Sequence, residues 1–303
     1  MARPDRTVDA MLGQAVITFR EVLEAALIVS ITLAYMTRTG RPGQARYVWW
    51  GVALAIVASL AVGVVVAVIA GTLDEGAMTL FEGAAALLAV SVLTAMILWM
   101  ATHGSGVEDA LKRRLGSATT RGTVLALVAF AFVVVFREGL ETVLFLTPLG
   151  GEELVGTVAG GAVGIGAAIA FSYALLRTGS RMNLRRFFFA TSVLLVLLAG
   201  GLAGYGVHEL IEHQEEVGAD VGWFGSTAYD LGIPASSPLH HKGIIGSVPA
   251  VMLGYAASME WGRVIVHLAY LAVFLPLTVA LYTKPGLVDR LMRLMRLRSP
   301  VVH

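Results

Sequence analysis

The sequence is short of several residue types, and each shortage excludes a class of protein. None of its 303 residues is cysteine, which excludes disulfides, thiolate metal sites and iron–sulfur clusters. Only 14% of the residues are charged, whereas a soluble domain carries about a quarter. The net charge of +1 gives no indication of a nucleic-acid partner. Any bound metal must therefore be held by oxygen or imidazole ligands.

Apolar residues are abundant instead, at 57% of the chain, and the mean hydropathy is +0.77. They form continuous blocks long enough for a helix to cross about 30 Å of hydrocarbon. Continuous blocks are typical of membrane helices and not of the alternating strands of a β-barrel. We therefore predict an all-α, polytopic membrane protein with seven transmembrane helices, near residues 11–36, 47–71, 77–101, 122–147, 154–176, 187–208 and 263–283.

The basic residues are concentrated in alternate loops, and this pattern sets the orientation. Loops rich in lysine and arginine face the cytoplasm. Most basic residues follow the first, third, fifth and seventh predicted spans: Arg38, Arg41, Arg46, Lys112, Arg113, Arg114, Arg121, Arg177, Arg181, Arg185, Arg186, Lys284, Arg290, Arg293, Arg296 and Arg298. The opposite loops carry Asp74, Glu75, Glu152 and Glu153. We expect the N-terminus outside and the C-terminus in the cytoplasm of a multi-pass protein of the cytoplasmic or plasma membrane.

We expect one transmembrane domain over residues 1–303, in which an outer loop (209–262) precedes the last span (263–283) and a basic cytoplasmic tail (284–303). Within that loop, residues 244–259 are apolar but short, and glycine and proline interrupt them. An eighth span there would place the basic tail outside. We therefore interpret this segment as a re-entrant or interfacial piece.

The chain also repeats itself. Residues 15–29 and 132–146 share the pattern F-R-E-x-L-E, 117 residues apart in the chain. The copies are three spans apart, an odd number, so they run in opposite directions. This pattern predicts an inverted three-plus-three repeat of the kind found in secondary transporters, with repeat 1 at about 11–101 and repeat 2 at about 122–208. The last helix is then an addition outside the repeat.

Charged residues inside the predicted spans carry the chemistry, because each costs at least about 2.5–3.5 kcal/mol at a helix centre. Five acids and two bases leave a surplus of three negative charges, which favours a cation. These residues are Arg20, Glu21, Glu24, Glu82, Arg137, Glu138 and Glu141.

The spacing of these charges predicts a single site. Each motif places an arginine four residues before a glutamate, so the pair shares a helix face. At helical rise, Arg20 lies about 13 Å and Glu141 about 9 Å below the outer surface. Arginine–glutamate pairs also serve as glue between helices, but two inverted copies with surplus negative charge favour an ion site. We expect Glu21, Glu24, Glu138 and Glu141 to surround one ion, with Arg20 and Arg137 as their partners. An all-carboxylate site suits Mg, Ca, Mn or ferric iron.

A second group of candidate ligands follows the sixth predicted span. It comprises His208, Glu209, Glu212 and His213, and Glu82 lies near the same outer end. The group is not the zinc-protease H-E-x-x-H motif, because position 212 is glutamate. It is either an accessory patch that collects cations or a solvated helix end.

The segments F-R-E-V-L-E (19–24) and F-R-E-G-L-E (136–141) resemble the paired R-E-x-x-E motifs of the oxidase-dependent iron permeases of fungi and bacteria. The resemblance to these permeases extends to three further segments: F-E-G (81–83), A-G-Y-G-V-H-E-L (203–210) and L-G-Y (253–255). The resemblance implies iron import, with the four motif glutamates as ligands and the two arginines as essential partners. Iron is then the substrate, and no cofactor is expected.

The resemblance also implies separate partners, namely a multicopper ferroxidase in fungi, or periplasmic iron-binding and haem-peroxidase proteins in bacteria. We expect membrane lipid as the other partner, and no oligomeric state is predicted. Three alternatives stay open: a carrier of manganese, lead or another divalent metal; a non-transporting scaffold or sensor subunit; and an intramembrane metalloenzyme, which would need histidine ligands within the spans. The sequence leaves ferric and ferrous iron both possible.

Overall fold

The computed structural model describes residues 4–103, 124–149, 154–178, 184–234, 236–240, 245–246, 249–250 and 253–284. Long helices dominate this part of the chain. The helices are α1 (Pro4–Arg38), α2 (Ala45–Ala70), α3 (Glu75–His103), α5 (Val124–Leu146), α6 (Leu154–Thr178), α7 (Leu184–Glu216) and α9 (Trp261–Thr283). Short 3-10 turns are η1 (Pro42–Gln44), η2 (Thr147–Leu149) and η3 (Gly222–Phe224), and the strands are β1 (Thr227–Asp230) and β2 (Ser258–Glu260). The predicted all-α class is thus correct, apart from one two-stranded antiparallel ribbon.

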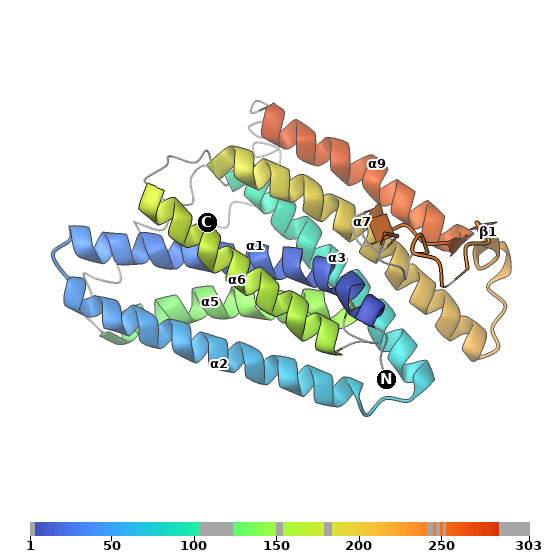
Figure 1. Cartoon of the computed structure of the whole chain (residues 1–303), viewed down its shortest axis with the longest axis horizontal. Helices are drawn as coiled ribbons and strands as arrows, with labels where there is room; N and C mark the ends of the chain where they lie inside the picture. The colour runs from blue at the N-terminus through green and yellow to red at the C-terminus, as the bar shows by residue number, and fades with distance from the viewer. Residues whose placement is uncertain are drawn as a thin grey trace, which may run out of the picture.

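The helices form an elongated bundle of up-and-down elements (Figure 1). Helix α1 packs along α6, and α2 packs along α5; α3 packs along α7, and α7 along α9. Helices α1 and α5 also contact each other and run in opposite directions (Figure 1). If α1, α2 and α3 are exchanged with α5, α6 and α7, this set of contacts within the six helices maps onto itself. The predicted inverted repeat has that symmetry.

Glycine makes the close helix contacts possible on both sides of this arrangement. A Cβ at Gly164 of α6 would lie 2.5 Å from the carbonyl oxygen of Ala15 on α1. A Cβ at Gly139 of α5 would overlap the hydroxyl of Ser59 on α2. Small residues allow membrane helices to approach backbone to backbone, where dispersion and weak polar contacts replace the hydrophobic effect. These glycines therefore set the positions of the two motif helices.

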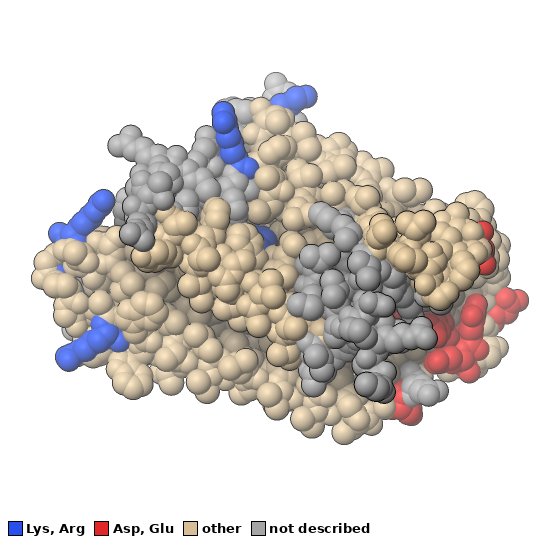
Figure 2. Space-filling model, viewed as in Figure 1, with Lys and Arg blue, Asp and Glu red and all other residues tan. Residues whose placement is uncertain are grey.

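Charge is separated between the two ends of the bundle. Lysine and arginine side chains gather where α1 ends and α2 begins and at the upper left, whereas aspartate and glutamate gather at the opposite end (Figure 2). The N-terminus of α1 lies at the acidic end (Figure 1). Basic residues at the cytoplasmic face are the expected signature of membrane insertion.

Five of the described helices are long and apolar enough to cross a membrane by length and composition: α2, α3, α6, α7 and α9, the first with its preceding turn. This finding supports a multi-pass membrane protein. Helices α1 and α5 are not in this set although both exceed 20 residues. Each carries three charged motif residues in the middle of an apolar stretch, so composition alone does not identify them as spans.

The sixth span was predicted to end at 208, but α7 continues to Glu216. Loss of hydropathy marks where a helix leaves the apolar layer, not where it ends, and glutamate, glutamine and leucine are good helix formers. The helix stops in a Schellman motif: the N–H of Ala219 donates to Gln214 O, that of Gly218 donates to Glu215 O, and Gly218 has φ +78°. The predicted outer loop 209–262 therefore begins with two further helical turns.

The predicted re-entrant segment 244–259 lies partly outside the described residues. Its last two residues belong to β2, whose Ser258 pairs with Asp230 of β1. The ribbon directly precedes α9, which begins at Trp261 instead of the predicted 263. Helix α1 is helical from the first described residue, Pro4, and so includes residues before the predicted start at 11.

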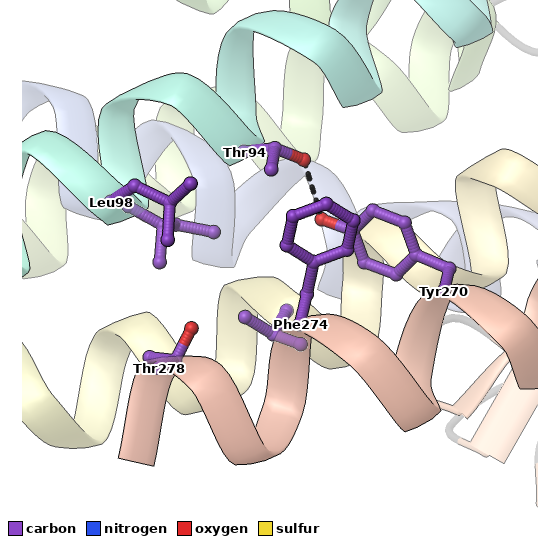
Figure 3. Close-up of a pocket in the computed structure, with 7 residues that line it drawn as sticks. Thr94, Leu98, Tyr270, Phe274 and Thr278 are labelled. Carbon is purple, nitrogen blue, oxygen red and sulfur yellow. Dashed lines mark hydrogen bonds between the residues drawn. The ribbon is translucent and has the colours of Figure 1, made fainter. Parts of the chain in front are cut away.

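Helix α9 packs against α7 and α3. The hydroxyls of Thr94 on α3 and Tyr270 on α9 lie 2.6 Å apart, beside Phe274 and Leu98 in a small gap between the helices (Figure 3). The hydrophobic core of α3, α7 and α9 surrounds this contact and reaches α1 through Ile17. That core packs against the motif helices, since it also includes Phe145 of α5.

Candidate metal site

The first motif forms a tightly paired, buried unit on α1. Nη1 of Arg20 lies 2.7 Å from Oε1 of Glu21, and its Nη2 lies 2.6 Å from Oε1 of Glu24. The Arg20 side chain is only 4% exposed. The same Nη1 also donates a hydrogen bond to Sδ of Met96 on α3, at 3.3 Å. Each nitrogen at the end of the guanidinium therefore has an acceptor.

The second motif, on α5, is paired in the same order but is more open. Arg137 places Nη2 3.1 Å from Oε1 of Glu138 and Nε 3.2 Å from Oε1 of Glu141. Its side chain is 52% exposed, in contrast to the buried carboxylate of Glu138. The two motifs have nearly the same sequence, but their arginines lie in different surroundings.

Three glutamates from the two motifs meet where α1 contacts α5. Ligand oxygens of Glu21, Glu138 and Glu141 all lie within 4.8 Å of one another. The second oxygen of each carboxylate, Oε2, is buried and has no hydrogen-bond partner in the described part of the chain. Buried carboxylate oxygens without partners are costly, because water would otherwise solvate them. Positive charge placed among these three carboxylates would therefore stabilise the protein.

A metal cation would stabilise these carboxylates better than one hydrogen-bond donor, because it contacts several oxygens at once. Oxygen ligands of a bound cation surround it at about 2.0–2.6 Å, so ligands on different sides of one ion are separated by roughly the spacing found here. Across both motifs, four glutamates and two arginines leave two formal negative charges. The net charge of this group of side chains therefore favours a cation.

Glu24, the fourth carboxylate predicted at this site, is placed differently. It is not a member of the group of three within 4.8 Å. Its Oε1 pairs with the buried guanidinium of Arg20 instead. In this structure Glu24 holds the arginine, while the other three glutamates face one another.

A second group of possible ligands lies at the acidic end of the bundle. Ligand atoms of His208, Glu209 and Glu212 on α7 also lie within 4.8 Å of one another. Nε2 of His208 is 3.8 Å from Oε2 of Glu212, and its Nδ1 is 3.3 Å from Oε2 of Glu260. The contact with His208 holds the pKa of the Glu260 carboxyl below its usual value. A carboxylate behind one ring nitrogen orients a histidine so that the other nitrogen can bind metal.

The two remaining predicted accessory residues have structural partners. Oε2 of Glu82 on α3 accepts a hydrogen bond of 2.6 Å from the hydroxyl of Tyr205 on α7. Nδ1 of His213 lies 2.8 Å from the carbonyl oxygen of Gly76. Both contacts join α3 to α7, so these side chains border the outer group without belonging to it.

Sequence reasoning did not find Met96, Tyr205 or Glu260. A methionine within an apolar helix carries no signal for a polar contact, and a tyrosine at such a position is common. Glu260 is 52 residues away from His208 in the chain. The packing of α9 along α7, together with the β1–β2 ribbon that leads into α9, brings the carboxylate of Glu260 to α7.

Comparison with known proteins places this geometry in context. The sequence matches the iron permease FTR1 family over residues 11–280. An uncharacterized protein of Archaeoglobus fulgidus is 50% identical over 267 residues, which cover 88% of this chain and 94% of that protein. The ferrous iron permease EfeU of Yersinia pestis is 34% identical over 260 residues (84% and 88%), and that of Escherichia coli O6:H1 is 33% identical over 277 residues (89% and 94%). No solved structure matches the chain.

Proposed function

Because this chain belongs to the iron permease FTR1 family, and is thus a transporter and not an enzyme, we propose that it imports iron across the cytoplasmic membrane through the paired motifs. Iron is the substrate that passes through the site. The observation that carries the proposal is the meeting of three glutamates from two helices, Glu21 and Glu138 buried and Glu141 partly buried. Each has one buried oxygen without a hydrogen-bond partner among the described residues. Glu21, Glu138 and Glu141 are the proposed ligands in this state, with Glu24 as the fourth carboxylate of the site.

Binding follows from charge and burial. An iron ion that leaves water loses its hydration shell, and three carboxylate oxygens replace part of that shell. The ion in turn offsets the repulsion among the carboxylates, which would otherwise keep them apart. Oxygen ligands alone suit ferric iron, and they also accept ferrous iron. The relatives named ferrous iron permease favour the ferrous ion as the transported species.

The arginines make binding reversible. Arg20 and Arg137 each hold Oε1 atoms of two glutamates of their own helix. They therefore compete with the ion for the same carboxylates. Four charged glutamates without arginine partners would bind a cation too tightly to release it. Glutamates that are partly neutralised by arginine can bind the cation and release it.

The topology in this proposal is seven spans with an inverted repeat, an outside N-terminus and a cytoplasmic C-terminus. The contact pattern supports the repeat, because exchange of the first three helices with α5, α6 and α7 preserves it. The separation of basic and acidic side chains between the two ends supports the orientation (Figure 2). The paired motifs then lie in the middle of the membrane, and the group around His208 lies on the outer side.

That outer group is proposed as the place where iron is first collected. His208, Glu209 and Glu212 offer one nitrogen and two oxygens, and Glu260 orients the imidazole. Glu82 and His213 border the route from there along α3 and α7. Delivery of iron to this face, by a separate ferroxidase or an extracytoplasmic iron-binding protein, completes the proposal.

Proteoliposomes that contain the purified protein test this function. Ferrous iron, ferric iron, Mn²⁺ and Zn²⁺ are offered separately, and metal in the lumen is counted. We expect iron to accumulate, Glu21→Ala and Glu138→Ala to abolish the accumulation, and Glu215→Ala, an exposed acid on α7, to leave it unchanged. Preferential uptake of Mn²⁺ or Zn²⁺ would overturn the choice of iron. Normal iron uptake by either motif variant would overturn the site.

A further inference from the structure

The two motif arginines differ in one contact that comes from outside the motifs. Arg20 is 4% exposed and Arg137 is 52% exposed, although the segments around them are nearly identical in sequence. Within the described residues, the polar partners of Arg137 are its own Glu138 and Glu141. Arg20 has a third partner, Sδ of Met96 on α3.

The contact fixes the direction in which the Arg20 guanidinium points. Nη1 donates to Oε1 of Glu21 and to Sδ of Met96, while Nη2 faces Glu24. A guanidinium has five N–H groups in a rigid plane, so these three contacts determine its orientation. The Oε2 atom of Glu21 is buried and has no hydrogen-bond partner among the described residues, and a ligand oxygen of this residue lies within 4.8 Å of those of Glu138 and Glu141.

Methionine suits this task because its sulfur accepts a hydrogen bond without adding charge. Met96 belongs to the buried core of α3 together with Leu93, Ile97 and Met100. A carboxylate at that place would compete with Glu21 and Glu24 for the arginine and would increase the negative charge. A leucine would leave Glu21 as the only acceptor of Nη1. One of the two N–H groups of that nitrogen would then have no partner, and the guanidinium could turn toward other carboxylate oxygens.

We propose that Met96 is a positioning residue of the site: its sulfur holds Arg20 on the Oε1 side of Glu21 and so keeps Oε2 of Glu21 open to the transported cation. The inference rests on the proposed function, and it adds a residue of α3 to a site built from α1 and α5. Since α3 packs on α7 and α9, Met96 also connects the motif of α1 to the rigid core of the protein.

The first test compares two substitutions that separate shape from hydrogen bonding. Met96→Leu keeps the volume and removes the acceptor, whereas Met96→Gln keeps a neutral acceptor at similar reach. Met100→Leu is the matched control, because Met100 lies one turn further on α3 and is equally buried, at 7% exposure. Iron uptake by proteoliposomes gives KM and the maximal rate, and the amount of folded protein is measured in parallel.

We expect Met96→Leu to raise KM about tenfold, as loss of one buried acceptor to a charged donor implies, with little change in the maximal rate. Met96→Gln should return KM to within about threefold of the unsubstituted protein, and Met100→Leu should have no effect. If leucine and glutamine impair uptake equally, or if Met96→Leu transports normally, Met96 does not position Arg20. If the unsubstituted protein moves no iron, the proposed function fails instead.

A second test does not depend on transport. Thermal unfolding of purified protein is measured for Met96→Leu, for Arg20→Gln and for the two together. If the sulfur acts through Arg20, the destabilisation caused by Met96→Leu should be largely lost when Arg20 is already replaced. Additive shifts in the two backgrounds would overturn the contact.

Discussion

Replacement of Glu138 by glutamine tests whether the three carboxylates are a cation site or merely a structural cluster. Glu138 is buried at 3% exposure, and its ligand oxygen lies within 4.8 Å of those of Glu21 and Glu141. Two like charges 4.8 Å apart repel each other by about 3.5 kcal/mol at an effective dielectric constant of about 20. Neutral glutamine removes two such repulsions from the protein without metal.

The substitution also removes a favourable contact, and the stability lost with that contact is smaller than the repulsion that is relieved. Glu138 pairs with Arg137, whose side chain is 52% exposed, and a solvated pair of this kind contributes about 1 kcal/mol or less. We therefore expect Glu138→Gln without metal to be at least as stable as the unsubstituted protein. Removal of one partner from a buried charge contact costs about 3–5 kcal/mol, so the dissociation constant for the cation should rise at least about 100-fold.

The measurement is thermal unfolding of purified protein in detergent, over a series of iron concentrations. Glu24→Gln is the matched control, because Glu24 is also buried but pairs with the buried Arg20 at 2.6 Å. That variant should unfold at a lower temperature than the unsubstituted protein even without metal. The reasoning is refuted if Glu138→Gln loses stability without metal as Glu24→Gln does, or if its stabilisation by iron is unchanged.

Three further predictions concern the framework of the site. Gly164→Ala should lower the amount of folded protein and its iron uptake, because a Cβ there meets the backbone of α1. Gly166→Ala, with open space around it, should be tolerated. Both variants are compared by their abundance in the membrane and by their iron uptake. Since the chain has no cysteine, Gly43→Cys should react with an impermeant thiol reagent only from the cytoplasmic side and Ser226→Cys only from outside, and the reverse pattern would contradict the orientation. Glu212→Gln should raise KM for iron at most about fivefold without a change in maximal rate, because this ligand is half exposed, and a fall in the maximal rate alone would contradict a collecting role.

The sequence was most informative where charged residues occur within an apolar segment. Buried arginine and glutamate stand out in an apolar helix. The two motifs are three spans apart, an odd offset, which predicts antiparallel helices, and their distances from the helix ends place both motifs at a similar depth. The structure brings Glu21, Glu138 and Glu141 together as this reasoning requires. That these residues bind the ion remains a prediction.

Other features depend on tertiary contacts that leave no local pattern. The two motifs have nearly the same sequence, so nothing in them distinguishes a buried Arg20 from a half-exposed Arg137. The contact of Arg20 with Met96 on α3 is likewise not visible in the motif. Hydropathy predicts the end of the sixth span at 208 but not how far α7 continues, to Glu216, because polar residues leave the membrane without breaking a helix. The β1–β2 ribbon was missed because its strands are only four and three residues long and are far apart in the chain.

The central claim is that one cation lies among carboxylates of both motifs. An anomalous difference map at the iron absorption edge, from crystals of the protein equilibrated with iron, shows directly where the metal lies. We expect one peak in the middle of the bundle, within about 2.5 Å of oxygens of Glu21, Glu138 and Glu141, and no such peak in Glu138→Gln. Iron bound elsewhere in the bundle, or a central peak that persists in the variant, would contradict the account.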